Sequence, residues 1–262
     1  MQIGVCTGPE NAAILEQAGF DYIEANVQAF LKPRDHDEAF DESRRAAEGC
    51  PLPIRAANGF VPGDLKSTGE QFDPDGIARY AEVAFRRANQ VGIEHIVFGS
   101  GGSRGLDEGF APEKANEQFV ELNRKLGPIA GEFGVVIVIE PLRRAECNFI
   151  NTITDGAAIV QQVDHPNVQL LADIYHMTQN GETPSSLKAF GSIIQHTHVA
   201  ENAGRTAPGV EGDDFRPYFQ ALAEVGYTGR MSVEGSWPDG MEALAAGAAQ
   251  TLRQQMADVN LD

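Results

Sequence analysis

The chain has 262 residues, a formal net charge of −18 and only three cysteines, which are widely spaced. This charge argues against nucleic acid and membrane partners, because binding to phosphate backbones and anionic lipid depends on Lys and Arg. Without a Cys-x-x-Cys pair, a basic and apolar leader before Ile3, or an apolar run near the ~20 residues of a membrane-spanning helix, we expect a cytoplasmic protein without disulfides or a thiolate zinc site.

Short apolar segments alternate with longer amphipathic ones along the whole chain. Eight short segments predict strands, at residues 3–7, 22–26, 54–60, 95–100, 135–140, 168–174, 193–200 and 230–234. Apolar residues at helical spacing predict helices over 77–91 and 119–133. The pairs Thr154-Asp155, Asp213-Asp214 and Pro238-Asp239 are expected to supply capping or first-turn residues for three later helices.

This alternation predicts an α/β protein in which residues 1–262 form a single (β/α)8 TIM barrel domain, since such barrels commonly run to about 250 residues. An open doubly wound sheet is the alternative. We find no linker, low-complexity tract or charge block that would divide the chain.

The segment 135–140 is the most informative strand. Five consecutive β-branched residues precede Glu140, and they favour a strand over a buried helix. A segment that is apolar on both faces suits a parallel strand between a barrel lumen and a layer of helices. Catalytic groups of such barrels lie at the carboxyl ends of strands, which makes Glu140 a candidate. A solvated charge at a strand end is the alternative.

Polar residues gather at the ends of the last four predicted strands: Glu140, Asp173, His176, His196, His198 and Glu234. Three carboxylates and one imidazole, from Glu140, Asp173, His198 and Glu234, form an oxygen-rich set that suits one divalent ion. We expect Mn²⁺ first, with Mg²⁺ or Co²⁺ as alternatives. His196 and His198 share one face of a strand, but both need not be ligands.

Three further features leave two interpretations each. The glycine-rich stretch 99–105 is either a tight turn or a phosphate cradle, and its Arg104 either contacts substrate or does not. The segment 58–60 begins either a lid or an ordinary surface loop. Trp237 forms either a wall for a sugar face or a cap on the core.

Five motifs carry a resemblance to a known family. They are Glu140-Pro-Leu-Arg-Arg-Ala-Glu146-Cys-Asn148, Asp173-Ile-Tyr-His176-Met, His196-Thr-His198-Val-Ala-Glu201, Arg205-Thr-Ala-Pro208-Gly209 and Ser232-Val-Glu234. In order and spacing they resemble the xylose isomerase-like TIM barrel superfamily. Within it, they are similar to the sugar phosphate isomerase/epimerase group that includes ketose 3-epimerases and hydroxypyruvate isomerases.

The resemblance implies roles for these residues. The metal would be held by Glu140, Asp173, His198 and Glu234. Glu140 and Glu234 would also transfer protons, and substrate oxygens would be contacted by Glu146, His176 and Arg205. The chain departs from the better-known ketose epimerases at Arg143, at Thr178-Gln-Asn and at Glu234-Gly-Ser-Trp, which leaves the identity of the substrate open.

The chemistry of these residues agrees with the resemblance. A divalent ion on a ketose carbonyl acidifies the neighbouring C–H, and two carboxylates can move the proton through a metal-stabilised enediolate. We therefore expect an isomerase or epimerase that acts on a small carbohydrate: a sugar, a sugar phosphate or a hydroxy-keto acid. The alternatives are an inosose-type dehydratase, a metal nuclease like endonuclease IV, and a sugar-binding barrel without turnover. Assembly into a homo-oligomer is compatible with all of them.

Overall fold

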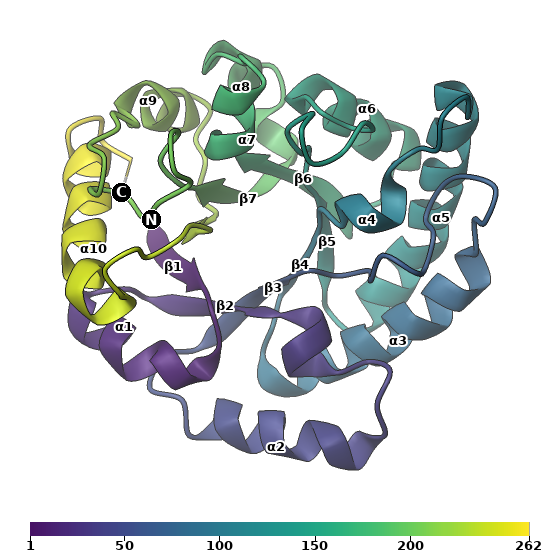
Figure 1. Ribbon diagram of the computed structural model, residues 1–262, viewed down its shortest axis with the longest axis horizontal. Coiled ribbons are helices and arrows are strands. Elements are labelled where there is room, and N and C mark those ends of the chain that lie inside the picture. Colours follow the sequence, from purple (N-terminus) through teal and green to yellow (C-terminus); the bar gives the residue numbers. More distant parts are fainter. Residues whose placement is uncertain (262) are drawn as a thin grey trace.

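The computed structural model describes residues 1–261, which form eight parallel strands closed into a barrel in the order β1 to β8 (Figure 1). Their bounds are β1 Gln2–Cys6, β2 Tyr22–Asn26, β3 Ile54–Asn58, β4 His95–Phe98, β5 Val136–Ile139, β6 Val168–Asp173, β7 Ile194–Val199 and β8 Arg230–Val233. Each strand overlaps one predicted segment. The predicted (β/α)8 barrel is confirmed, and the open doubly wound sheet is wrong, because β1 pairs with β8.

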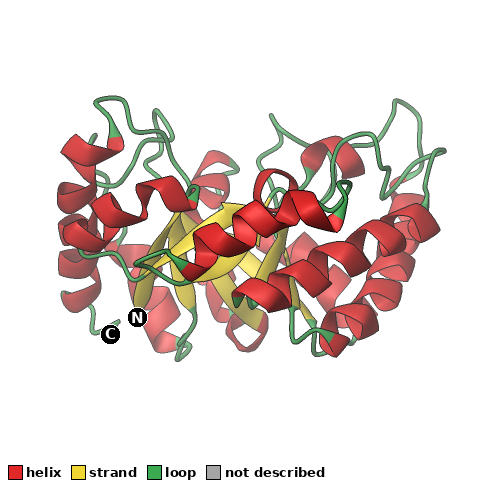
Figure 2. Ribbon diagram, turned by 90° about the horizontal axis from the view of Figure 1, so that it is seen from below, coloured by secondary structure: helices red, strands yellow, loops and turns green. Residues whose placement is uncertain are grey.

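Helices surround the strands in both views (Figures 1 and 2). They are α1 Ala12–Ala18, α2 Asp37–Glu48, α3 Pro74–Val91, α4 Gly101–Arg104, α5 Pro112–Glu132, α6 Ile153–Val163, α7 Ile174–Gln179, α8 Ser185–Lys188, α9 Arg216–Glu224 and α10 Met241–Ala257, with short turns η1 Pro9–Asn11, η2 Val27–Leu31 and η3 Gly191–Ile193. The helices predicted over 77–91 and 119–133 lie within α3 and α5, apart from Phe133, the residue that follows α5. Within residues 1–261, every helix is too short or too polar to span a bilayer.

The predicted helix start is confirmed for α6 and needs correction at α10. Thr154 and Asp155 lie in the first turn of α6, and Thr152 caps this helix by a reciprocal cap with Asp155. Asp214 accepts a hydrogen bond from the backbone N–H of Arg216 at 3.1 Å, in the first turn of α9. Gly240 precedes α10, so Pro238-Asp239 lies outside that helix.

Strand β5 is buried on both faces, as its apolar sequence predicts. On the inner face, Val138 packs with Val97 of β4 and Leu171 of β6, in a small cluster that fills part of the lumen. On the outer face, Ile137 and Ile139 join the large core between strands and helices. The chain leaves β5 at Glu140, and this side chain therefore emerges at the carboxyl end of the barrel.

Candidate active site at the carboxyl ends of the strands

The four predicted metal ligands lie at the same end of the barrel. Glu140 directly follows β5, and Asp173 is the last residue of β6. His198 is the second-last residue of β7, and Glu234 directly follows β8. Asp173 and His198 are direct neighbours in the register of β6 and β7. Glu140, Asp173 and His198 are buried, whereas Glu234 is partly exposed. Glu140 and Glu234 are 94 residues apart in the sequence, but the barrel places both of them in the lining of one cavity.

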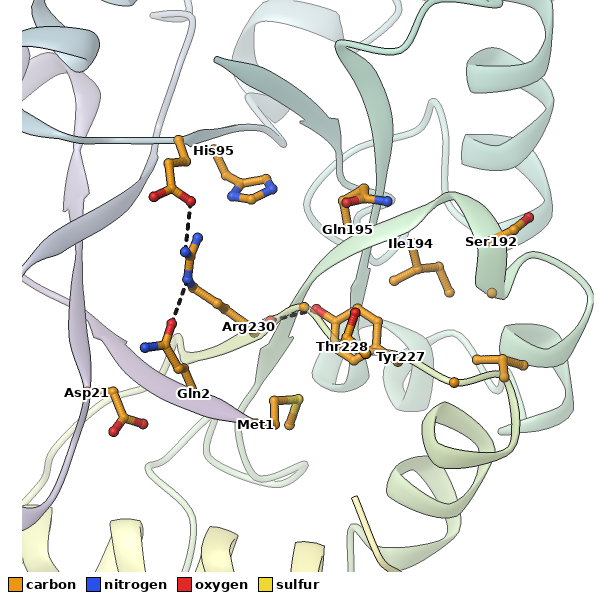
Figure 3. Close-up of a pocket in the computed structure, with 15 residues that line it drawn as sticks. Met1, Gln2, Asp21, His95, Ser192, Ile194, Gln195, Tyr227, Thr228 and Arg230 are labelled. Carbon is orange, nitrogen blue, oxygen red and sulfur yellow. Dashed lines mark hydrogen bonds and ion pairs between the residues drawn. The ribbon is translucent and has the colours of Figure 1, made fainter. Parts of the chain in front are cut away.

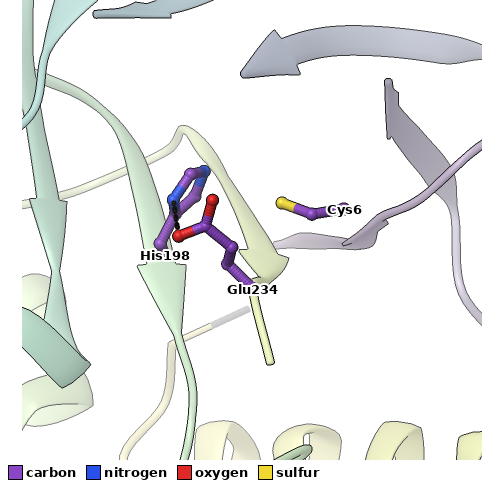
Figure 4. Close-up of side chains that lie close together, drawn as sticks. All are labelled: Cys6, His198 and Glu234. Atoms are coloured by element: carbon purple, nitrogen blue, oxygen red, sulfur yellow. Dashed lines mark ion pairs between the residues drawn. The ribbon is translucent and has the colours of Figure 1, made fainter. Parts of the chain in front are cut away.

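His198 lies between two groups of carboxylates. Its Nδ1 is 3.2 Å from Glu140 Oε1 and 3.6 Å from Glu234 Oε2. Its Nε2 lies 2.9 Å from Oε1 of Glu24, a residue of β2. Figure 4 shows the Cys6 thiol directed to the same space as His198 and Glu234. Sequence reasoning gave Cys6 no role at the site, and burial raises the pKa of its thiol.

A second imidazole lies beside the same carboxylates. Donor atoms of Glu140, Asp173, His176 and Glu234 all lie within 4.8 Å of one another. His176 Nε2 is 3.5 Å from Asp173 Oδ2 and 4.0 Å from Glu146 Oε2. The other oxygen of Asp173 accepts hydrogen bonds from the backbone at the start of α7, which holds this carboxylate in place.

The predicted substrate contacts Glu146, His176 and Arg205 line a cavity of about 280 Å³ together with Glu140 and Glu234. Arg205 donates to Oε2 of Glu234 and, at 3.2 Å, to Oε1 of Glu146. Its guanidinium also lies 4.8 Å from the ring centroid of Tyr175, a cation–π distance. These contacts restrain Arg205 above the carboxylates.

Two residues that sequence reasoning did not assign to the chemistry shape this pocket. Asn58, at the end of β3, donates a hydrogen bond of 2.8 Å to Glu234 Oε1. Gly99, just after β4, lies so close to the Glu140 carboxylate that a Cβ at this position would overlap it. Asn58 also lines an adjoining cavity of about 400 Å³ above β1 and β2, which reaches Cys6 and Phe30.

The structure decides between the interpretations of Arg104 and favours one for Trp237. Arg104 is fully buried and donates to the backbone oxygens of Phe98, Glu140 and Ile150, so it supports the loop beneath the site and is not a substrate contact. Residues 101–104 of the glycine-rich stretch form the single turn of α4. Trp237 is half-buried and packs against the large core, as a cap does.

Burial acts differently on the two glutamates. Burial and the neighbouring Glu234 raise the pKa of Glu140. Burial also raises the pKa of Glu234, but His198 and Arg205 outweigh this effect and lower it to about 2. For His198, burial lowers the pKa, but the adjacent Glu24 carboxylate is among the groups that raise it well above its usual value. The site therefore holds two carboxylates in distinct electrostatic environments.

The site contains buried polar atoms that the protein itself does not satisfy. Among residues 1–261, Glu140 Oε1, His176 Nε2 and His198 Nδ1 are buried and lack a hydrogen-bond partner. Such atoms are costly unless a ligand satisfies them. Oxygens of Glu140, Asp173 and Glu234 with one imidazole nitrogen match the donor preference of a divalent ion such as Mn²⁺. The residues present therefore fit a metal ion.

Comparisons with known proteins agree with this geometry. The family described as Xylose isomerase-like TIM barrel matches residues 12–255. The chain is 34% identical to the D-psicose 3-epimerase of Ruminiclostridium cellulolyticum, over 82% of this chain and 74% of the relative. It is 30% identical to the L-ribulose 3-epimerase of a Methylomonas species, over 83% and 74%. A solved D-psicose 3-epimerase with D-tagatose, from Clostridium cellulolyticum, shares the fold with a TM-score of 0.81, at 22% identity over 99% of both chains.

Proposed function

Because the chain belongs to the xylose isomerase-like TIM barrel family, we propose that it is a sugar isomerase or epimerase that works with one divalent metal ion. One observation carries the proposal. Buried carboxylate and imidazole atoms without hydrogen-bond partners converge at the carboxyl ends of β5 to β8, around a cavity lined by polar side chains. In a barrel of this kind, that is where chemistry is placed.

The ion would be held by Glu140, Asp173, His198 and Glu234, with Mn²⁺ as the first choice and Mg²⁺ or Co²⁺ as alternatives. When bound, such an ion supplies positive charge that stabilises negative charge on substrate oxygens. Gly99 contributes by leaving room for the Glu140 carboxylate. Asn58 and Arg205 contribute by fixing the orientation of Glu234.

The hydrogen bonding of His176 supports a role as a substrate contact and not as a metal ligand. Its Nδ1 accepts a hydrogen bond of 3.3 Å from the backbone N–H of Arg143. A neutral ring that accepts at Nδ1 carries its proton on Nε2, and this N–H can donate to a substrate oxygen but cannot bind a metal. Oε2 of Glu146 lies 4.0 Å from the same nitrogen, and Glu146 lines the same cavity.

Glu140 and Glu234 would divide the proton transfer. They follow β5 and β8, which are three strands apart in the closed barrel, so they reach the cavity from different sides. One carboxylate removes the proton next to the carbonyl, which leaves an enediolate, and the other returns a proton. Return to the opposite face of the same carbon gives an epimer. Return to the neighbouring carbon gives an aldose–ketose isomer.

The charges around the cavity favour a neutral ketose over a sugar phosphate or hydroxypyruvate. Three glutamates, Glu140, Glu146 and Glu234, line the cavity. Among the described residues that line it, Arg205 is the only arginine or lysine, and its guanidinium is already engaged by Glu234 and Glu146. A phosphate would therefore meet no free cationic side chain and would be repelled by carboxylates.

Incubation with Mn²⁺ in D₂O against ketoses, ketose phosphates, hydroxypyruvate and inososes, followed by NMR, tests the function. We expect a neutral ketose to gain deuterium next to its carbonyl at a rate linked to its conversion. Loss of water from an inosose would indicate the dehydratase, and nicking of abasic plasmid DNA would indicate the nuclease. Binding without conversion or exchange across the panel would contradict the proposal in favour of a sugar-binding barrel.

A further inference from the structure

We propose that Glu24 of β2 is a positioning residue for the metal site. Its carboxylate holds the His198 ring by Nε2 and so directs Nδ1 of that ring toward Glu140 and Glu234. This inference rests on the metal site in the proposed function. It assigns a task to the fully buried Glu24, which lies on the far side of His198 from the cavity carboxylates.

Glu24 belongs to a polar half of the barrel lumen. Opposite the apolar cluster of β4, β5 and β6, the strands β2, β7 and β8 contribute Glu24, His196, His198 and Ser232, all with no solvent exposure. Burial of a carboxylate is costly unless charged or hydrogen-bonding partners compensate for it. For Glu24 this compensation comes from His198, His196 and the Ser232 hydroxyl, which all meet its two oxygens.

The hydrogen bonds of Glu24 define which ring nitrogens carry protons. Oε1 lies 2.9 Å from His198 Nε2, and Oε2 lies 2.7 Å from His196 Nε2 and 2.6 Å from the Ser232 hydroxyl. An ionised carboxylate only accepts hydrogen bonds, so both rings must present an N–H at Nε2. His198 can then offer the lone pair of Nδ1 to a metal ion, the arrangement that a carboxylate behind a ligating histidine commonly enforces.

Replacement of Glu24 by glutamine separates this role from simple core packing. The amide keeps the shape of the side chain but replaces one acceptor oxygen by an N–H donor. The three donors that meet Glu24 then compete for one oxygen, and His198 loses the anion that holds its proton on Nε2. The matched control is His196→Gln, because it changes another partner of Glu24 and leaves the contact with His198 in place.

Calorimetric titration of the metal-free protein with Mn²⁺ is the decisive measurement. We expect Glu24→Gln to weaken Mn²⁺ binding by about 10- to 100-fold, the usual effect of losing such a partner, while His196→Gln changes it by less than about threefold. Thermal unfolding of both variants measures the structural cost that they share. Equal Mn²⁺ affinity in Glu24→Gln and wild type would overturn the inference, as would an equal loss in both variants.

A second measurement needs no variant, in case Glu24→Gln fails to fold. NMR of the Zn²⁺-loaded wild type with isotope-labelled histidine ring nitrogens should show His198 protonated at Nε2 and free of a proton at Nδ1. A proton on Nδ1 would overturn the inference. Failure of the wild type to bind either ion would instead refute the metal site of the proposed function, which keeps the two failures distinct.

Discussion

The two ends of the barrel differ in whether their charged and polar side chains are paired within the protein. At the amino end lies the larger cavity, of about 750 Å³, where Arg230 donates to Gln2 at 2.9 Å and to Glu94 at 2.7 Å (Figure 3). Glu94 also accepts from Arg55 at 3.0 Å. The smaller cavity at the carboxyl end instead contains Glu140 and neighbouring imidazoles with buried atoms that no protein group satisfies. Among the described residues, the amino-end cavity has one such atom, His95 Nδ1, whereas several from different strands converge at the carboxyl end. This convergence, and not cavity size, identifies the candidate site.

The largest expected effect comes from the carboxylates at the carboxyl end. Glu140→Gln and Glu234→Gln should each lower kcat by about 10²- to 10⁴-fold, because an amide cannot take or return a proton. Metal occupancy, measured by elemental analysis, should fall less than turnover, since an amide oxygen can still be a ligand. Loss of metal in step with activity would reduce both residues to ligands only.

Metal removal should destabilise the protein as a whole. A ligand that binds only the folded state at a hundred times its Kd adds about 2.7 kcal/mol, which corresponds to roughly 5–10 °C in Tm for a chain of this size. We expect EDTA to lower Tm by this amount and Mn²⁺ to restore it. A Tm that does not respond to EDTA would refute the assignment of Glu140, Asp173, His198 and Glu234 as metal ligands.

A smaller effect distinguishes the two imidazoles within the carboxyl end. His176→Ala should retain one ion per chain and lose roughly tenfold in kcat/KM, because it removes one hydrogen bond to substrate. His198→Ala should lose the ion. Arg205→Ala and Glu146→Ala should behave like His176→Ala. If His176→Ala lost the ion while His198→Ala retained it, the roles of the two rings would be reversed.

Much of this site could be predicted from sequence, because its residues follow strands with strong apolar patterns. Five β-branched residues predict β5, and the residue that ends such a strand must lie at the barrel mouth, so Glu140 could be placed without a structure. The same argument places Asp173, His198 and Glu234. Strand ends can be recognised from the local sequence, and the closure of the barrel then brings these residues together.

The remaining contacts depend on distant parts of the chain. Arg104 was open to a substrate role, and only its contacts with three backbone oxygens show that it is structural. Asn58 meets Glu234 across 176 residues of sequence. Glu24 offered one signal, an acidic residue between apolar neighbours in a predicted strand. Its partner His198, which lies 174 residues further along the chain, could not be inferred from spacing.

The smallest effect is expected at the amino end, where Glu94→Gln makes the same chemical change as Glu234→Gln at the opposite end of β8. Glu94 pairs with Arg55 and with Arg230, the first residue of β8, and its side chain is 43% exposed, so these exposed ion pairs contribute about 1 kcal/mol. We expect kcat and Mn²⁺ affinity to stay within about twofold of wild type, and Tm to fall by no more than about 2–4 °C.

Kinetics, Mn²⁺ titration and thermal unfolding of Glu94→Gln beside Glu234→Gln complete the comparison. Both variants remove one carboxylate charge, so a general effect of charge on the barrel would act on both alike. If kcat is much lower in Glu234→Gln than in Glu94→Gln while the two variants have similar Tm, the chemistry takes place at the carboxyl end. A tenfold loss of kcat in Glu94→Gln would mean that the larger cavity is coupled to turnover, and the paired charges around Arg230 would then no longer mark that end as structural.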